Sequence, residues 1–359
     1  MLKNLWNTKN SAIVGIDIGS HSAKAVFISQ GSDGYILEAV ATEPMPRGAI
    51  VDREIQDIEA VGNVIAKLRS KITSSVSNAA AAVSGQTVIT KVIYMDVALT
   101  EQELASQIEI EADSLIPYPL DEVSLDFERL EVNESDPTKI NVLLSAARTE
   151  SVEARVSALE AGGFTTKVVD VESYALSRSF DLILPLLPDD AAEKIVAIVD
   201  IGALMTLFSV TQAGENIYSR DQLFGGEQYT RSIVSYYNMS FEEAEISKIA
   251  GDLPPNYTFE VLAPFHTILV QQIRRAIQMF LTSSGKEKID YLVISGGCAQ
   301  VEGIHELLNE ELGVHTVIAN PFSAMKISSA IDEQELNNTA SQYMVAAGLA
   351  LRSFSSWHI

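Results

Sequence analysis

The chain has 359 residues, 47% of them hydrophobic and 20% charged, which suits a folded protein of one large α/β unit or several packed subdomains and excludes a disordered chain. Its 48 Asp and Glu residues against 25 Lys and Arg residues give a formal net charge of −23. Such a charge repels nucleic-acid phosphates and anionic lipid heads, so neither is expected as a partner.

The beginning of the chain and its single cysteine indicate a cytoplasmic protein. Residues 1–6 lead into polar residues instead of the apolar core of a signal peptide. No stretch approaches the roughly 20 apolar residues that cross a membrane as a helix. Cys298 cannot form an internal disulfide, and we expect its thiol to be buried and inert in a reducing compartment.

The first part of the chain predicts strands followed by a helix. Residues 13–30 predict two strands joined by a turn, and residues 35–45 predict a third strand. Apolar residues then recur at spacings of three and four from Ile58 to Ile72, which is typical of a helix lying on a sheet. Residues 79–83 predict a short buried strand.

Residues 86–167 predict a compact inserted block. The polar cluster at residues 133–137 is typical of a hairpin loop between two strands. Thr100 with Glu103 predicts a capping box at the start of a helix. The expected elements are a strand at 88–97, the helix after Thr100, strands near 126–132 and 140–147, and a helix at 150–161.

A second set of strands and helices follows. Leu269, Ile273, Ala276 and Phe280 are spaced as on the buried face of a helix. The remaining expected elements are three strands at 195–201, 204–211 and 216–223, a strand at 291–295 and a last helix at about 340–353.

A weak internal repeat links the two parts. The apolar segments 13–19 and 196–202 both end in Asp-Ile-Gly and are both followed by an outgoing apolar strand. Each repeat places a carboxylate, Asp17 or Asp200, at the rim of a sheet beside a glycine that lets a ligand approach the backbone. If the halves close on each other, their turns present N–H groups to phosphates and the carboxylates lie near a cation. This predicts a cleft for ATP with Mg²⁺.

A third glycine-containing segment follows the strand at 291–295. Gly296 and Gly297, with Gly303 beyond them, leave room for a flat ring and predict the turn that binds adenosine. A plain strand-to-helix turn is the alternative.

The order and spacing of these motifs resemble the actin, heat-shock chaperone and sugar-kinase superfamily over nearly the whole chain. The block after residue 86 resembles the relocated subdomain of the FtsA and PilM branch. Segments 22–26, 47–50, 115–118 and 126–127 are similar to the type IV pilus assembly PilM family, whereas His21 stands where a small residue is expected.

The resemblance implies an α/β fold of the actin-like ATPase type, with two similar halves around a nucleotide cleft. The connecting helices are expected at 172–181 and 341–353, where small residues permit close packing. The implied units are a first half (12–85, 169–193 and 338–355), an inserted subdomain (86–168), a second half (194–225 and 286–337) and a helical subdomain (226–285).

The resemblance also implies a set of nucleotide contacts. Asp17 and Asp200 are expected to hold the metal through water, and Glu172 is the candidate for orienting the attacking water. A helix-start carboxylate is the alternative for Glu172, and a solvated helix face is the alternative for Glu245 and Lys248. The expected contacts are Gly19, Ser20, His21, Ser22, Lys24, Gly202, Ala203, Thr206, Gly225, Gly226, Glu245, Lys248, Gly296, Gly297 and Gly303.

By resemblance, the chain is expected to be a cytoplasmic ATP-binding component of type IV pilus assembly, possessing slow ATPase activity at most. The implied partners are the cytoplasmic N-terminal tail of PilN, other inner-membrane and motor components of the pilus, and a further copy of this chain. A groove beside the inserted subdomain, near Ile93, Leu115, Ile116 and Tyr118, is expected to take the tail.

Two other functions remain open at the level of sequence. A filament-forming protein similar to FtsA normally adds a C-terminal amphipathic membrane helix, whereas this sequence stops at Ile359 just after the expected second connecting helix. Membrane contact is therefore expected to be indirect. A small-molecule kinase of the same fold needs a catalytic base in a deep substrate pocket, and no such motif stands out.

Overall fold

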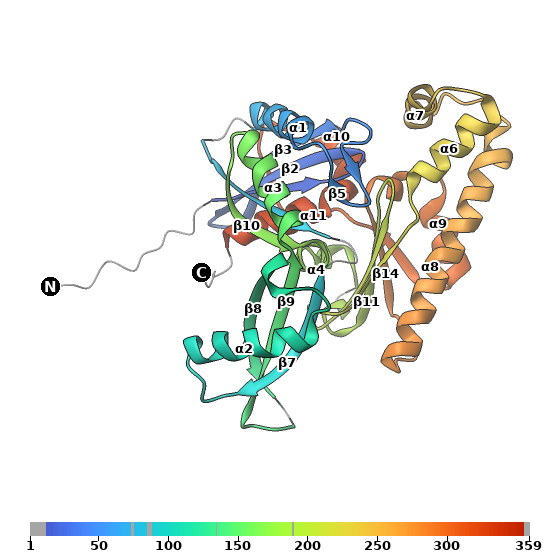
Figure 1. Cartoon of the computed structure of the whole chain (residues 1–359). Helices are drawn as coiled ribbons and strands as arrows, with labels where there is room; N and C mark the ends of the chain where they lie inside the picture. Colours follow the sequence, from blue (N-terminus) through green and yellow to red (C-terminus); the bar gives the residue numbers. More distant parts are fainter. Residues whose placement is uncertain (1–11, 73–74, 85–87, 134, 189, 355–359) are drawn as a thin grey trace.

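A computed structural model describes residues 12–72, 75–84, 88–133, 135–188 and 190–354. The opening residues that bear on export lie outside these ranges. Figure 1 shows two large sheets, one containing β2 and β3 and the other containing β11 and β14, with a smaller unit of β7, β8, β9 and α2 beside them.

The first sheet contains the expected N-terminal strands. β1 and β2 pair antiparallel, as do β2 and β3, while β6 and β10 add to the other side of β1 in parallel. β10 lacks a counterpart among the predicted elements. In spatial order the strands are β10 (Thr165–Val171), β6 (Asn78–Val83), β1 (Val14–Ile18), β2 (Ser22–Gly31), β3 (Gly34–Pro44) and β16 (Lys326–Ile327).

The second sheet repeats this topology. Its first two strands form an antiparallel pair like β1 and β2, and the strand on the other side of β11 is parallel. In spatial order the strands are β13 (Glu215–Gln222), β12 (Thr206–Gln212), β11 (Ile195–Ile201), β14 (Tyr291–Ser295) and β15 (His315–Ile318). The predicted repeat is therefore confirmed as two matching sheet motifs.

Helices α4 (Glu172–Arg178) and α11 (Met344–Ala350) share a buried cluster with strands of both large sheets. A Cβ atom on Gly348 would lie 1.8 Å from the carbonyl oxygen of Ala175, so these helices meet at backbone contact. The small residues expected in the connecting helices are thus required by close packing. Each predicted helix is shorter than expected, because α5 (Phe180–Ile183) starts anew after Ser179 and 3₁₀ turns flank α11.

Most of the other helices pack on faces of the two large sheets, whereas α7 packs against α6 (Figure 1). The middle of the predicted stripe is buried on α1, whereas Ile58 is 41% exposed and Ile72 follows the end of the helix. Leu269, Ile273 and Phe280 are buried on α8 as predicted. The helices are α1 (Ile58–Lys71), α3 (Thr149–Ala161), α6 (Gly226–Tyr237), α7 (Phe241–Ala250), α8 (Ala263–Ser284), α9 (Ile304–Leu312) and α10 (Glu333–Thr339).

The inserted unit has a core of its own, built by α2 (Glu101–Leu115) on a three-stranded sheet. Thr100 and Glu103 form the predicted capping box at the start of α2. The Asn133 side chain accepts hydrogen bonds from the backbone N–H groups of Ser135 and Asp136, which shapes the predicted hairpin loop. In spatial order the strands are β7 (Ile89–Asp96), β9 (Lys139–Arg148) and β8 (Val123–Val132).

Two packing observations differ from the expected subdomain bounds. Ala158 and Leu159 of α3 pack with α1 in the core of the first half, and β10 belongs to the first sheet. The separate inserted core is therefore smaller than residues 86–168. Near the C-terminus, β16 pairs with β3 and Leu336 of α10 packs in a cluster of the first half, which divides the block 286–337 between the halves.

The expected peptide-groove residues belong to the core of the inserted unit. Ile116 is buried there, and Ile93, Leu115 and Tyr118 pack against the same cluster. Ile93, Leu115 and Tyr118 are only partly buried, so their contribution to a groove for the tail stays a prediction. These side chains are the apolar face by which α2 and the sheet cover each other, so they are already in contact within the unit.

Candidate nucleotide cleft

Two strand turns of the same construction face each other across the cleft. The N–H of Gly19 donates to the carbonyl of Ser22 at 3.2 Å, and the N–H of Gly202 donates to the carbonyl of Met205 at 2.9 Å. A Cβ atom on either glycine would lie 2.9 Å from that same carbonyl oxygen. Both turns therefore require glycine, which explains why the Asp-Ile-Gly segments recur.

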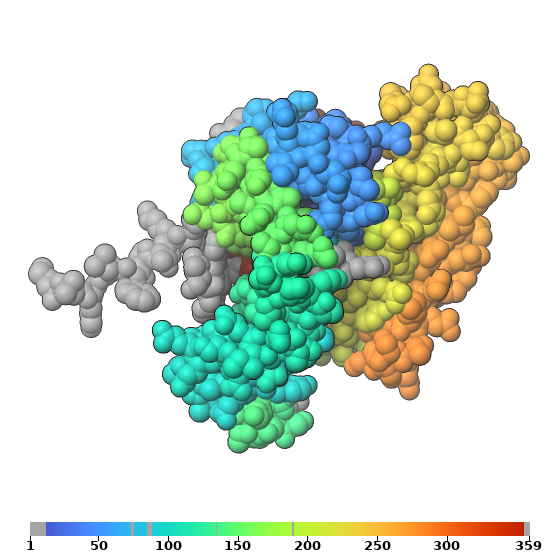
Figure 2. All heavy atoms as spheres, in the orientation of Figure 1, coloured from blue at the N-terminus to red at the C-terminus, as the bar shows by residue number. Residues whose placement is uncertain are grey.

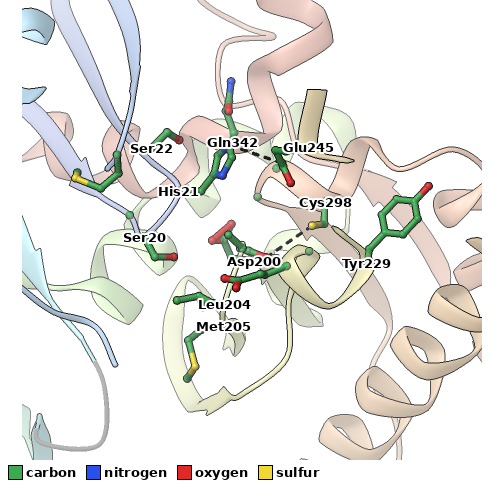
Figure 3. A pocket seen from close by; sticks show the side chains of 18 of the residues that line it. Ser20, His21, Ser22, Asp200, Leu204, Met205, Tyr229, Glu245, Cys298 and Gln342 are labelled. Atoms are coloured by element: carbon green, nitrogen blue, oxygen red, sulfur yellow. Dashed lines mark hydrogen bonds and ion pairs between the residues drawn. The ribbon is translucent and has the colours of Figure 1, made fainter. Parts of the chain in front are cut away.

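The turns line one cavity of about 990 Å³ between the halves, within the range typical of ligand sites. Figure 2 shows a hollow between the blue first half and the yellow second half. In Figure 3, Ser20 and His21 approach the cavity from one side, and Asp200, Leu204 and Glu245 from the other. The expected contacts that line it are Gly19, Ser20, His21, Ser22, Lys24, Gly202, Ala203, Gly226, Glu245, Lys248, Gly296 and Gly297.

Carboxylates gather on the floor of the cavity. Lys24 Nζ lies 3.0 Å from Asp17 Oδ2, and although burial acts against the charged amine, Asp17 raises the pKa of Lys24. Asp200 Oδ1 accepts a hydrogen bond of 2.9 Å from the Ser295 hydroxyl. Burial, followed by the nearby charges of Glu172 and Asp17, raises the pKa of Asp200 to about 7.

This arrangement suits a divalent cation that is bound partly through water. A cation beside Asp17 and Asp200 would relieve the repulsion and desolvation that hold the Asp200 carboxyl close to neutrality. Among the residues that the structure describes, no cluster of three or more His, Cys, Asp or Glu side chains forms a metal cage. Magnesium commonly uses one or two carboxylates, water and substrate phosphates, so the site fits it.

The glycine turn after β14 opens onto the same cavity. Gly296 has φ of 83°, and a Cβ there would lie 2.4 Å from the carbonyl oxygen of Ile201. At Gly297, by contrast, a Cβ would meet nothing within 4 Å. The space beside Gly297 is therefore open to a ligand in the cavity. Burial raises the pKa of the neighbouring Cys298 thiol to about 11, as expected for an inert cysteine.

Glu245 and Lys248 are tied together inside the cleft rather than lying on a solvated helix face. Glu245 accepts hydrogen bonds from the Thr230 hydroxyl at 2.6 Å and from Lys248 Nζ at 2.8 Å. Burial acts to raise the pKa of Glu245, but Lys248 and Thr230 lower it overall. His21 Nε2 reaches Glu245 across the cleft at 3.8 Å (Figure 3), and burial lowers the pKa of His21.

Three expected nucleotide contacts do not line the cavity. The Thr206 hydroxyl is buried and donates to the carbonyl of Phe224 at 2.8 Å. A Cβ on Gly225 would lie 2.4 Å from the carbonyl oxygen of Ala203. Gly303 adopts a left-handed conformation at the start of α9. All three residues shape the backbone around the cleft. They lie near the nucleotide site as predicted, but they are not expected to touch the nucleotide.

Arg53 lines the cleft with a side chain that is 13% exposed, and the sequence analysis did not single it out. Arg53 Nη1 donates to Glu172 Oε2 at 2.7 Å, and Arg53 Nη2 lies 3.5 Å from Asp221 Oδ1. The candidate water-orienting carboxylate of Glu172 is therefore held in an ion pair. Arg53 lies in a two-residue turn between the short strands β4 (Ile50–Val51) and β5 (Glu54–Ile55), and no glycine or repeat in the sequence marked that turn.

Comparisons with known proteins agree with the motifs and the topology. The profile of the type IV pilus assembly protein PilM family matches residues 15–354. The chain belongs to this family. A solved PilM-PilN type IV pilus biogenesis complex is similar at 24% identity and a TM-score of 0.81, covering 96% of this chain and 99% of that one. The ethanolamine utilization protein EutJ of Carboxydothermus hydrogenoformans is similar at 15% identity and a TM-score of 0.57, covering 95% and 90%. The fold is that of the actin-like ATPases.

Proposed function

We propose that this chain binds ATP with Mg²⁺ in the cleft and that the bound nucleotide controls its attachment to a PilN tail during pilus assembly. The observation that carries the proposal is the pair of matched glycine turns that face one cavity whose floor holds Asp17 and Asp200. Backbone turns and a metal offset the strongly negative charge of the protein locally, which is what binding a polyanion here requires.

The residues of the cleft suggest how a nucleotide would be held. The turns at Gly19 and Gly202 would face the phosphates, and Asp17 and Asp200 would hold the cation through water. The base and ribose would lie between the open space at Gly297 and the pair of Glu245 and Lys248, which would account for these two charged residues being inside the cavity. Magnesium would supply charge neutralisation at the phosphates.

Hydrolysis, where it occurs, is expected to be slow. Glu172 lines the cavity and is the candidate for orienting water. Its carboxylate is engaged by Arg53 at 2.7 Å, so it would have to be released or reoriented before it could act in this way. We therefore assign the nucleotide a switching role before a catalytic one.

A PilN tail would bring the chain to the inner membrane from the cytoplasm. Within the described residues, no helix combines the length and apolar character needed to cross a bilayer. The open face of the inserted sheet offers an apolar surface for the tail. Val92 and Tyr94 on β7 are 49% and 63% exposed, and Tyr174 of α4 lies close to Thr90 on the same strand. The tail would lie between α4 and this sheet.

The test is a titration of fluorescent ATP with Mg²⁺ into the wild-type protein and into a variant carrying Asp17→Ala and Asp200→Ala, each with and without the PilN tail peptide. We expect the variant to lose at least about tenfold in affinity, because each lost carboxylate removes a metal contact. We also expect peptide affinity to depend on nucleotide in the wild type alone. Equal ATP affinity in both proteins would indicate an adaptor that works without nucleotide.

A further inference from the structure

Arg53 occupies an unusual backbone position at the edge of the cleft. The hairpin between β4 and β5 turns through Asp52 and Arg53, whose φ angles are 49° and 68°. Left-handed conformations are uncommon for residues other than glycine, and the surrounding structure has to support them. Two successive residues of this kind imply that the surrounding structure holds the turn in place.

A buried arginine provides that support from α3. Arg155 Nη2 donates to the carbonyl of Arg53 at 2.8 Å, and its Nε and Nη1 donate to the carbonyls of Ala82 and Ser151 at 2.6 and 2.9 Å. These bonds hold the backbone of the turn and leave the Arg53 side chain to be positioned by its own partners. The side chain projects into the cleft and is 13% exposed.

The partners of the Arg53 guanidinium come from different halves. Glu172 begins α4, whereas Asp221 lies on β13 of the second sheet. Burial acts to lower the pKa of Arg53, but Glu172, Asp221, Asp200 and Asp17 raise it overall, so the guanidinium stays charged beside the carboxylates at the proposed metal site. Of the two ion pairs, that with Asp221 is longer, at 3.5 Å against 2.7 Å.

We propose that Arg53 is the residue that distinguishes a nucleoside triphosphate from a diphosphate, by exchanging Asp221 for the terminal phosphate while keeping Glu172. This inference rests on the proposed nucleotide function. A guanidinium has five donors in a planar fork that suits a phosphate, so it can hold Glu172 and a phosphate at once. With a diphosphate bound, Arg53 keeps bridging the halves through Asp221. With a triphosphate bound, that bridge opens.

The experiment measures the dissociation constants of fluorescent ATP and ADP, both with Mg²⁺, for four proteins. They are the wild type, Arg53→Gln, Asp221→Asn and the control Arg129→Gln, in which Arg129 pairs with Glu101 in the inserted unit. We expect Arg53→Gln to weaken ATP binding about tenfold or more and ADP binding at most about threefold, since charge-assisted bonds to the terminal phosphate are lost. Arg129→Gln should leave both constants unchanged.

The direction in which Asp221→Asn changes the preference for ATP over ADP separates the proposal from a purely structural ion pair. The substitution removes the competitor for the guanidinium, so the preference for ATP over ADP should rise severalfold, whereas a merely structural ion pair would weaken both nucleotides alike. A preference unchanged in Arg53→Gln, or lowered in Asp221→Asn, would overturn the inference. If Arg53→Gln does not fold, Arg53→Lys keeps the charge without the fork and should show an intermediate preference. A wild type that binds neither nucleotide would overturn the proposed function itself.

Discussion

Replacing Asp200 by Asn should make the protein more stable at neutral and alkaline pH while it weakens the metal site. Burial and the charges of Glu172 and Asp17 raise the pKa of Asp200 from its ordinary value of 3.8 to about 7 in the folded protein. Asparagine has nearly the same shape and keeps an oxygen that can accept the Ser295 hydroxyl hydrogen bond of 2.9 Å. It removes the charge that the fold disfavours.

The sign and size of the effect follow from proton linkage. The folded pKa of Asp200 is above the unfolded one, so this group does not destabilise the fold below pH 3.8, where it is protonated in both states. The destabilisation grows between pH 3.8 and about pH 7 and is constant at higher pH. One pKa unit corresponds to about 1.4 kcal/mol, so the ceiling is about 4 kcal/mol. Water in the open cavity lowers the actual figure, and we expect roughly half of it.

The assay is urea unfolding of the wild type and Asp200→Asn at pH 5 and pH 8 without nucleotide. The variant's gain in midpoint should be larger at pH 8 than at pH 5. Asp290→Asn is a control of opposite sign: burial acts to raise the pKa of Asp290, but Lys288 and the Ile195 N–H lower it overall. The Asp290→Asn variant should be less stable than the wild type at both pH 5 and pH 8. A wild type as stable as Asp200→Asn at pH 8 would refute the reasoning about a buried, disfavoured charge.

Two further predictions concern packing and the partner surface. Gly348→Ala places a Cβ 1.8 Å from the Ala175 carbonyl oxygen, so it should lower the melting temperature by several degrees. The control Gly297→Ala places a Cβ that meets nothing within 4 Å and should leave the melting temperature nearly unchanged. Equal losses in the two variants by thermal unfolding would contradict the contact between α4 and α11. Tyr94→Ser should weaken binding of the PilN tail peptide about tenfold by calorimetry, since it removes an exposed aromatic anchor. Ile110→Ser, on α2 and 74% exposed, is the matched control and should have no effect; unchanged affinity in Tyr94→Ser would remove the open sheet face as the docking surface.

The sequence alone determined the elements whose signals are local. The apolar stripe of α1, the capping box of α2 and the Asp-Ile-Gly segments depend on spacing along the chain, and each appears where it was predicted. The repeat around Asp17 and Asp200 also predicted that two turns would share one cleft, because the same strand, turn and strand pattern builds the same sheet edge twice.

Only the tertiary structure decided which side chains meet across the cleft. Arg53 is held by Glu172 from more than a hundred positions away and by Asp221 from the other half, and no periodicity encodes such a contact. The same limit applies to the expected groove: apolar residues such as Ile116 signal burial, but whether α2 or a partner buries them depends on packing. Spacing fixes local conformation, whereas long-range contacts depend on how the complete chain closes on itself.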